Sequence, residues 1–134
     1  MLNKLNNRRG GFTLVEIMIV VAIIALLAAI VVPGFLRARK RSQASKVLND
    51  LRLIDSAVDQ YAIENNKKAG ETVTVAAWTQ YMKGGTKLGT DGGHPTYGSY
   101  GAQTVDALPK VPTAAFNELS DVAPSEFWAP YPTQ

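Results

Sequence analysis

Hydrophobic and polar positions divide the chain into parts with different periodicities. Residues 12–32 are apolar except for Thr13 and Glu16. As a helix they rise about 31 Å, enough to cross a hydrocarbon core of about 30 Å. Fourteen of them are Leu, Ile, Val or Phe. Their insertion is favourable by about 4–8 kcal/mol, against roughly 3 kcal/mol for Glu16. This segment is therefore predicted to span a membrane.

A second helical pattern follows Pro33 and Gly34, where the missing amide and the proline ring predict a kink or local opening. Beyond it, apolar residues recur at spacings of four and three, which predicts one buried stripe on an amphipathic helix ending near Asn65. The stripe consists of Val47, Leu51, Ile54, Val58 and Tyr61, with Ala44 and Leu48 alongside. Two ion pairs, Lys46 with Asp50 and Arg52 with Asp55, are expected on the opposite, wet face.

Turn-forming residues mark residues 70–134 as a small head. Short helices are expected at residues 75–82, capped by Thr74, and at residues 113–119 after Pro112. The glycine-rich stretch 88–101 predicts turns, and residues 95–100 predict a short strand paired with residues 103–107. His94 is expected in an exposed loop. The proline-rich tail is expected to be held on the head by its aromatic residues, which are Phe127, Trp128 and Tyr131.

Charge changes this picture less than the sequence pI near 9.3 suggests. The formal net charge of +3 equals that of residues 1–11 alone; residues 37–52 carry +5 and residues 53–134 carry −4. A uniformly basic, nucleic-acid-binding surface is therefore not indicated. The absence of cysteine and the single histidine exclude disulfides, cysteine-ligated metals and histidine clusters. No catalytic triad or phosphate-binding loop is recognisable, so the chain is not expected to be an enzyme.

The residues around the start of the apolar segment decide how it is processed. A secretory signal has a shorter apolar core that ends in a cleavage site. A twin-arginine signal has a different spacing between its arginines and the phenylalanine that follows. The stretch from Arg8 to Glu16 instead resembles the type III signal of type IV prepilins and type II secretion pseudopilins. That resemblance implies cleavage between Gly11 and Phe12, N-methylation of Phe12, an assembly role for Glu16, and a family counterpart for Pro33.

Glu16 needs a partner for its charge inside an apolar helix. After cleavage the nearest cation is the α-ammonium of Phe12, one helical turn away. Glu16 can neutralise its own N-terminus, helped by the helix dipole, or pair with the N-terminus of a neighbouring subunit. The resemblance implies the second arrangement.

The expected fold is α+β, a pilin-like lollipop with a long N-terminal helix and a small C-terminal head of short helices and few strands. The expected parts are a leader at residues 1–11, an apolar membrane or filament-core helix at 12–36, an amphipathic helix at 37–66, and the head at 67–134. The resemblance covers residues 8 to about 60.

The resemblance implies a structural subunit of a type IV pilus-like filament, and most closely a type II secretion pseudopilin. Its partners would be further copies of itself, a prepilin peptidase and N-methyltransferase, an assembly platform with its ATPase, and minor pilins or pseudopilins. It would wait in the bacterial inner membrane, N-terminus inside, before entering a periplasmic or extracellular filament. The alternatives are a surface type IV pilin, and a membrane-anchored module that binds DNA or another polymer.

Two further candidate sites remain. The basic residues Arg37, Arg39, Lys40 and Arg41 form a charge collar that could contact anionic lipid, neighbouring subunits or DNA. Many major pseudopilins bind calcium in an acidic loop. No dense cluster is visible here, because the acids Asp91, Asp106, Glu118, Asp121 and Glu126 are scattered. No cofactor is therefore expected, with a calcium site as the alternative.

Overall fold

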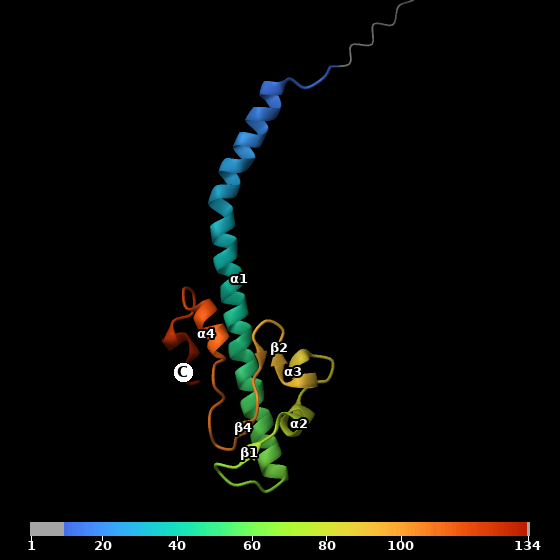
Figure 1. Ribbon diagram of the computed structural model, residues 1–134, viewed down its shortest axis with the longest axis vertical. Coiled ribbons are helices and arrows are strands. Elements are labelled where there is room, and N and C mark those ends of the chain that lie inside the picture. The colour runs from blue at the N-terminus through green and yellow to red at the C-terminus, as the bar shows by residue number, and fades with distance from the viewer. Residues whose placement is uncertain (1–9, 134) are drawn as a thin grey trace, which may run out of the picture. The chain divides into compact units, whose positions relative to one another are not determined.

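The computed structural model describes residues 10–133. They divide into two compact units between Leu36 and Arg37. The long helix α1, Leu14–Glu64, supplies the first unit and continues into the second (Figure 1). The predicted end of this helix near Asn65 is confirmed. Helical backbone also continues through Pro33 and Gly34, so the proline is accommodated inside α1; the kink stays a prediction.

Short elements make up the rest of the second unit. In chain order they are β1 (Thr72–Val73), α2 (Val75–Trp78), the 3-10 helix η1 (Thr79–Tyr81), α3 (Lys87–Asp91), β2 (Gly93–His94), β3 (Gly98–Ser99), β4 (Gln103–Thr104), α4 (Thr113–Leu119) and the 3-10 helix η2 (Ser125–Trp128). The predicted combination of a long apolar helix with a small head of short helices and few strands is confirmed.

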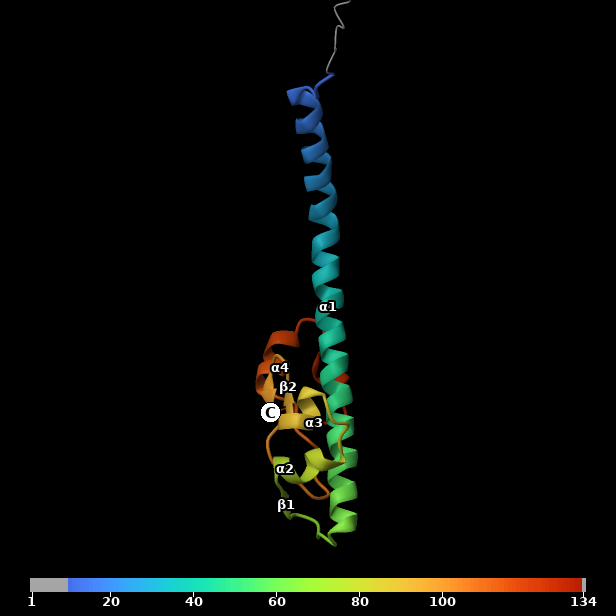
Figure 2. The same ribbon diagram turned by 90° about the vertical axis from the view of Figure 1, so that its right-hand side faces the viewer.

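The apolar stripe on α1 packs against two clusters of the head core. Its residues are buried as the spacing predicts, except Leu48 and Tyr61, which are partly buried. The upper cluster joins Val47 and Leu51 to α4 and to Trp128 of η2. The lower cluster joins Ile54 and Val58 to β1, α2, α3 and the segment after β4. Figures 1 and 2 show these elements lying along the second half of α1, with α4 nearer the beginning of that half and β1 near its end. Tyr100 packs partly against both clusters.

The strand pairing differs from the prediction. Residues 95–100 do not pair with residues 103–107. Instead β3 pairs with β2, His94 opposite Gly98, and β4 pairs with β1, Thr72 opposite Thr104. Both pairings are antiparallel and only two residues long. Such short segments carry no periodicity that could specify a partner, so turn geometry and side-chain packing decide it.

The helices of the head also required corrections. The predicted helix at residues 75–82 is split into α2 and η1, and Thr74 lies at the N-cap without a capping hydrogen bond from its side chain. The glycine-rich stretch contains α3, which was predicted as turns. The Thr86 side chain accepts a hydrogen bond from the Gly89 amide at its start, and Gly92 closes it in the left-handed region at φ 68°. A Cβ on Gly92 would lie 2.9 Å from the Trp78 ring, so this position requires glycine.

The predictions for the C-terminal helix and the proline-rich tail agree with the structure. The helix α4 occupies the predicted residues, with Pro112 at its N-cap. Trp128 is fully buried and Tyr131 is almost so, while Phe127 is partly buried beside them. The aromatic residues thus hold the proline-rich tail on the head, as predicted.

Candidate functional site

The predicted processing site lies immediately before α1. Gly11 and Phe12 are outside the helix, and the Phe12 side chain is 85% exposed. A Cβ built on either Gly10 or Gly11 would meet nothing within 4 Å. The backbone at Gly10 and Gly11 is therefore accessible, and packing does not require glycine at either position. Residues 1–9 of the predicted leader lie outside the described residues. Cleavage and N-methylation stay predictions.

Thr13 and Glu16 close the start of α1 with a reciprocal pair of hydrogen bonds. The Thr13 amide donates to Oε2 of Glu16 at 2.8 Å, and the Glu16 amide donates to Oγ1 of Thr13 at 3.2 Å. This arrangement is a capping box, in which the two side chains satisfy two amide groups that have no partner inside the helix. Caps of this kind contribute about 0.5–2 kcal/mol to helix stability.

The capping box is a role of Glu16 that the sequence analysis missed. Its signal was present, because a threonine followed three residues later by glutamate, just before an apolar run, is the sequence pattern of this motif. The structure therefore adds a third partner, the Thr13 amide, to the two proposed for Glu16. Its pairing with an N-terminal ammonium, within one subunit or between subunits, stays a prediction.

Within residues 10–36, the part of the first unit that the structure describes, nothing covers the apolar part of α1. Its large side chains are exposed from Leu14, at 77%, to Leu36, at 50%. The helix is long and apolar enough to cross a membrane. So much uncovered apolar surface on one helix is far more than a soluble monomer normally carries. The segment therefore requires a bilayer or other apolar helices around it.

The four residues of the charge collar are not equivalent. Lys40 is half-buried and forms an ion pair with Asp121 of its own head at 3.0 Å. Arg37, Arg39 and Arg41 are exposed, and among residues 10–133 none of them forms an ion pair. The structure thus brings one collar residue to the head and leaves three arginines facing outward.

Two buried polar side chains contradict the sequence analysis. Asp50 was expected to pair with Lys46 on the wet face, but it is 6% exposed and accepts a hydrogen bond from the Tyr100 hydroxyl at 3.0 Å. It lies at the edge of the buried stripe, where Tyr100 covers it. Burial raises the pKa of Asp50, and the Tyr100 hydrogen bond opposes this. The predicted pairs Lys46–Asp50 and Arg52–Asp55 are both absent from the ion pairs of residues 10–133.

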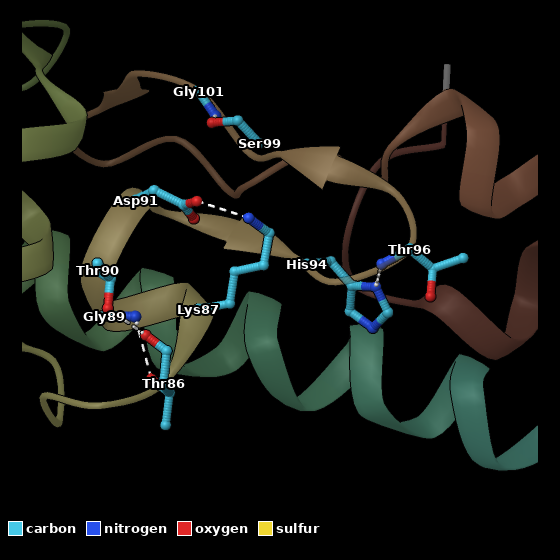
Figure 3. Close-up of polar contacts among 9 residues, drawn as sticks. All are labelled: Thr86, Lys87, Gly89, Thr90, Asp91, His94, Thr96, Ser99 and Gly101. Carbon is cyan, nitrogen blue, oxygen red and sulfur yellow. Dashed lines mark hydrogen bonds and ion pairs between the residues drawn. The ribbon is translucent and has the colours of Figure 1, made fainter.

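His94, expected in an exposed loop, is 2% exposed within β2. Its ring stacks on Tyr97. Figure 3 shows the hydrogen bond that Nδ1 accepts from the Thr96 amide at 3.1 Å. An accepting Nδ1 places the proton of the neutral ring on Nε2, which has no hydrogen-bond partner among residues 10–133. Desolvation lowers the pKa of His94, and nearby Lys46 lowers it further, against the opposing effect of Asp50. The head thus buries a neutral histidine.

Replacing Tyr100 by phenylalanine is expected to destabilise the head by about 1–3 kcal/mol, because a buried carboxylate then loses its donor. Tyr81→Phe is the matched control, since Tyr81 donates to Glu64 at the surface, and a much smaller change is expected there. The measurement is urea unfolding of the full chain in detergent micelles. Tryptophan fluorescence reports the head alone, because Trp78 and Trp128 are the chain's two tryptophans. Equal losses in the two variants would contradict this role of Asp50.

The stability of the head is expected to fall as the pH falls below 6.5, the ordinary pKa of histidine. Below this pH His94 binds a proton in the unfolded chain, but in the folded chain its lowered pKa keeps it neutral. Protonation therefore favours unfolding. Asp50, with its raised pKa, has the opposite effect at more acidic pH. The comparison is therefore best made between about pH 7 and 5. His94→Asn, which keeps an acceptor near the position of Nδ1, should flatten the slope of unfolding free energy against pH. An unchanged slope would show that other groups cause it.

Within the part of the chain that the structure describes, no three His, Cys, Asp or Glu side chains converge as metal ligands. Asp91 pairs with Lys87 at 2.6 Å and Asp121 with Lys40, so these two acids are already engaged. The expectation of no cofactor stays a prediction.

Comparisons with known proteins agree with this arrangement of motif, apolar helix and head. The family described as "Prokaryotic N-terminal methylation motif" matches residues 6–32, which include Gly11, Phe12 and Glu16. The chain is 34% identical over 113 residues to the type IV major fimbrial protein FimA of Dichelobacter nodosus, covering 84% of this chain and 69% of that protein. The chain therefore belongs to the type IV pilin-like family.

Other relatives come from both branches of this family. The type II secretion system core protein G of Aeromonas hydrophila is 35% identical over 60 residues, covering 45% of this chain and 42% of that protein. The type IV major pilin protein PilA of Myxococcus xanthus is 40% identical over 65 residues, covering 48% and 30%. The matched region thus spans less than half the length of these two relatives. No solved structure gives a significant match.

Proposed function

We propose that the chain is a non-enzymatic structural subunit of a type IV pilus-like filament, and specifically a type II secretion pseudopilin. The observation that carries the proposal is the uncovered apolar half of α1, most of which lies within the matched methylation motif at residues 6–32. A helix of this kind is stable in a bilayer, and it is equally stable packed among identical helices. A subunit that moves from the first environment to the second needs both properties.

The proposed sequence of events begins with a precursor in the bacterial inner membrane, its N-terminus inside. A prepilin peptidase cuts between Gly11 and Phe12 and methylates Phe12. Helix–helix contacts then replace acyl-chain contacts as the apolar half of α1 enters the filament core. Glu16 favours correct registration with the subunit beneath. The energy for extraction comes from a separate assembly platform and its ATPase, and minor pseudopilins complete the assembly.

Two observations favour the pseudopilin over a surface pilin. Several of the matched relatives are named type II secretion system core protein G. The chain also has no cysteine, so it cannot form the disulfide that closes the C-terminal loop of many type IV pilins. The surface pilin remains the second candidate, because the match to the fimbrial protein covers more of both chains.

The test is co-expression with a prepilin peptidase, followed by measurement of the N-terminal mass and electron microscopy of sheared material. We expect loss of residues 1–11, addition of one methyl group, and helical filaments. Protein that stays uncut, or that is cut but never assembles in the presence of a complete assembly system, would contradict the proposal. Short filaments confined to the envelope would support the pseudopilin, and long surface filaments the pilin.

A further inference from the structure

The three free arginines of the charge collar lie where α1 leaves the apolar segment. From Leu14 to Leu36 the helix rises about 35 Å, slightly more than the hydrocarbon core of a bilayer. Arg37, Arg39 and Arg41 follow within the next turn and a half of the same helix. When the apolar segment spans a bilayer, their guanidinium groups therefore reach the level of the lipid headgroups.

The arginines are distributed around the helix and do not share one face. At about 100° per residue, Arg37 and Arg41 lie about 40° apart, and Arg39 lies about 200° from Arg37. Lys40 falls between these two flanks, on the line of the buried stripe, where it pairs with Asp121. The head thus forms an ion pair with Lys40, the one collar residue that faces it. A partner that surrounds the helix, as lipids do, can contact both remaining flanks at once.

Acidic groups of the head are less available to the collar than the charge count suggested. Glu71 and Asp91 form ion pairs within the head, Asp121 pairs with Lys40, and Glu64 accepts a hydrogen bond from Tyr81. Asp50 is buried. Five other acids form no ion pair within residues 10–133, so the choice of an external anion rests on the position and distribution of the arginines; these acids are Asp55, Asp59, Asp106, Glu118 and Glu126.

We propose that Arg37, Arg39 and Arg41 bind the phosphate headgroups of anionic phospholipids while the chain is held in the membrane. Guanidinium groups bind phosphate oxygens in bidentate pairs, so arginine suits this partner. The inference rests on the membrane-held stage of the proposed function and does not need the filament. It makes the collar a retention contact that must be broken before a subunit leaves the bilayer.

The experiment uses the full chain reconstituted in phosphatidylcholine vesicles with trace spin-labelled lipid. The fraction of motionally restricted lipid is compared between labelled phosphatidylglycerol and labelled phosphatidylcholine. We expect the wild type to prefer phosphatidylglycerol by about fivefold or more. High salt should reduce the preference. In the triple variant Arg37→Gln, Arg39→Gln, Arg41→Gln, the preference should fall to near one.

The matched control removes the same charge from the head. Lys68, Lys83 and Lys110 are exposed and form no ion pair within residues 10–133. Their triple replacement by glutamine should keep the preference for phosphatidylglycerol. The inference is overturned if the embedded wild type shows no preference, or if the arginine variant keeps it. It is equally overturned if that variant loses filament yield but keeps the preference for phosphatidylglycerol, because this would assign the arginines to neighbouring subunits. A wild type that never enters the vesicles would contradict the membrane stage of the proposed function itself.

Discussion

Gly11→Val should leave the chain uncut, with the full mass of residues 1–134, and should abolish filaments. The family resemblance implies that the peptidase requires glycine before the cut, and a branched Cβ would obstruct its access to that bond. The uncut leader would keep Lys4, Arg8 and Arg9 attached to the helix. Three cations cannot enter an apolar helix bundle without a large desolvation cost. The measurement is the intact mass after co-expression with the peptidase, together with microscopy.

The structure makes this prediction specific to processing. A Cβ on Gly11 meets nothing within 4 Å, and the same holds for Gly10. Gly10→Val is therefore a matched control that adds the same side chain one residue away. The peptidase should cut it at a rate far closer to that of the wild type than it cuts Gly11→Val. Equal losses in both variants would show general disruption of the leader. Normal cutting of Gly11→Val would place the cleavage site elsewhere.

Glu16→Gln should insert into the membrane normally but lower filament yield by about tenfold or more. Breaking one partner of a buried charge pair costs about 2–5 kcal/mol, and an N-terminal ammonium of a neighbour would be left unpaired in the filament core. Glutamine can still form the capping box, so this variant removes the charge and keeps the helix start. Glu16→Ala removes both and should assemble no better. Yield is measured in sheared fractions, and insertion by resistance to carbonate extraction.

Thr13→Ala completes the comparison, because it removes the Oγ1 acceptor of the capping box and leaves the Glu16 carboxylate and its bond from the residue 13 amide in place. It should assemble well, with at most a small loss from fraying of the first helical turn. If instead Thr13→Ala fails and Glu16→Gln assembles, then the cap is what the filament requires, and the charge is dispensable. These two single changes therefore separate the contribution that the structure shows from the one that the family resemblance implies.

Long periodic features were predictable from the sequence. The apolar segment and the stripe through Val47, Leu51 and Ile54 each extend over many residues, and burial of such a stripe outweighs local preferences. Their positions and the end of α1 agree with the structure. The processing motif was recognised because its residues stand at fixed spacing, and its match to residues 6–32 supports the same conclusion.

Short-range and long-range details of the head were not predictable. Nothing near His94 indicates that Tyr97 would stack on it and bury it, since that depends on how the β2–β3 turn packs. Asp50 looks like a surface residue until Tyr100, fifty positions away, covers it. The two-residue strands likewise choose their partners through tertiary packing. The capping box, in contrast, is local and could have been found.

The two clusters of the head core have a consequence for how these proteins diverge. Both pack on the helix α1, and among residues 10–133 only Tyr100 packs against both. The lower cluster can therefore change its loops and short helices with little effect on the upper cluster. In an architecture of this kind, both clusters constrain the sequence of α1, while the segments that cover it can vary more freely. The matches to the core protein G relatives cover only 45% of the chain, an extent expected when relatives keep a common long helix and vary the segments that cover it.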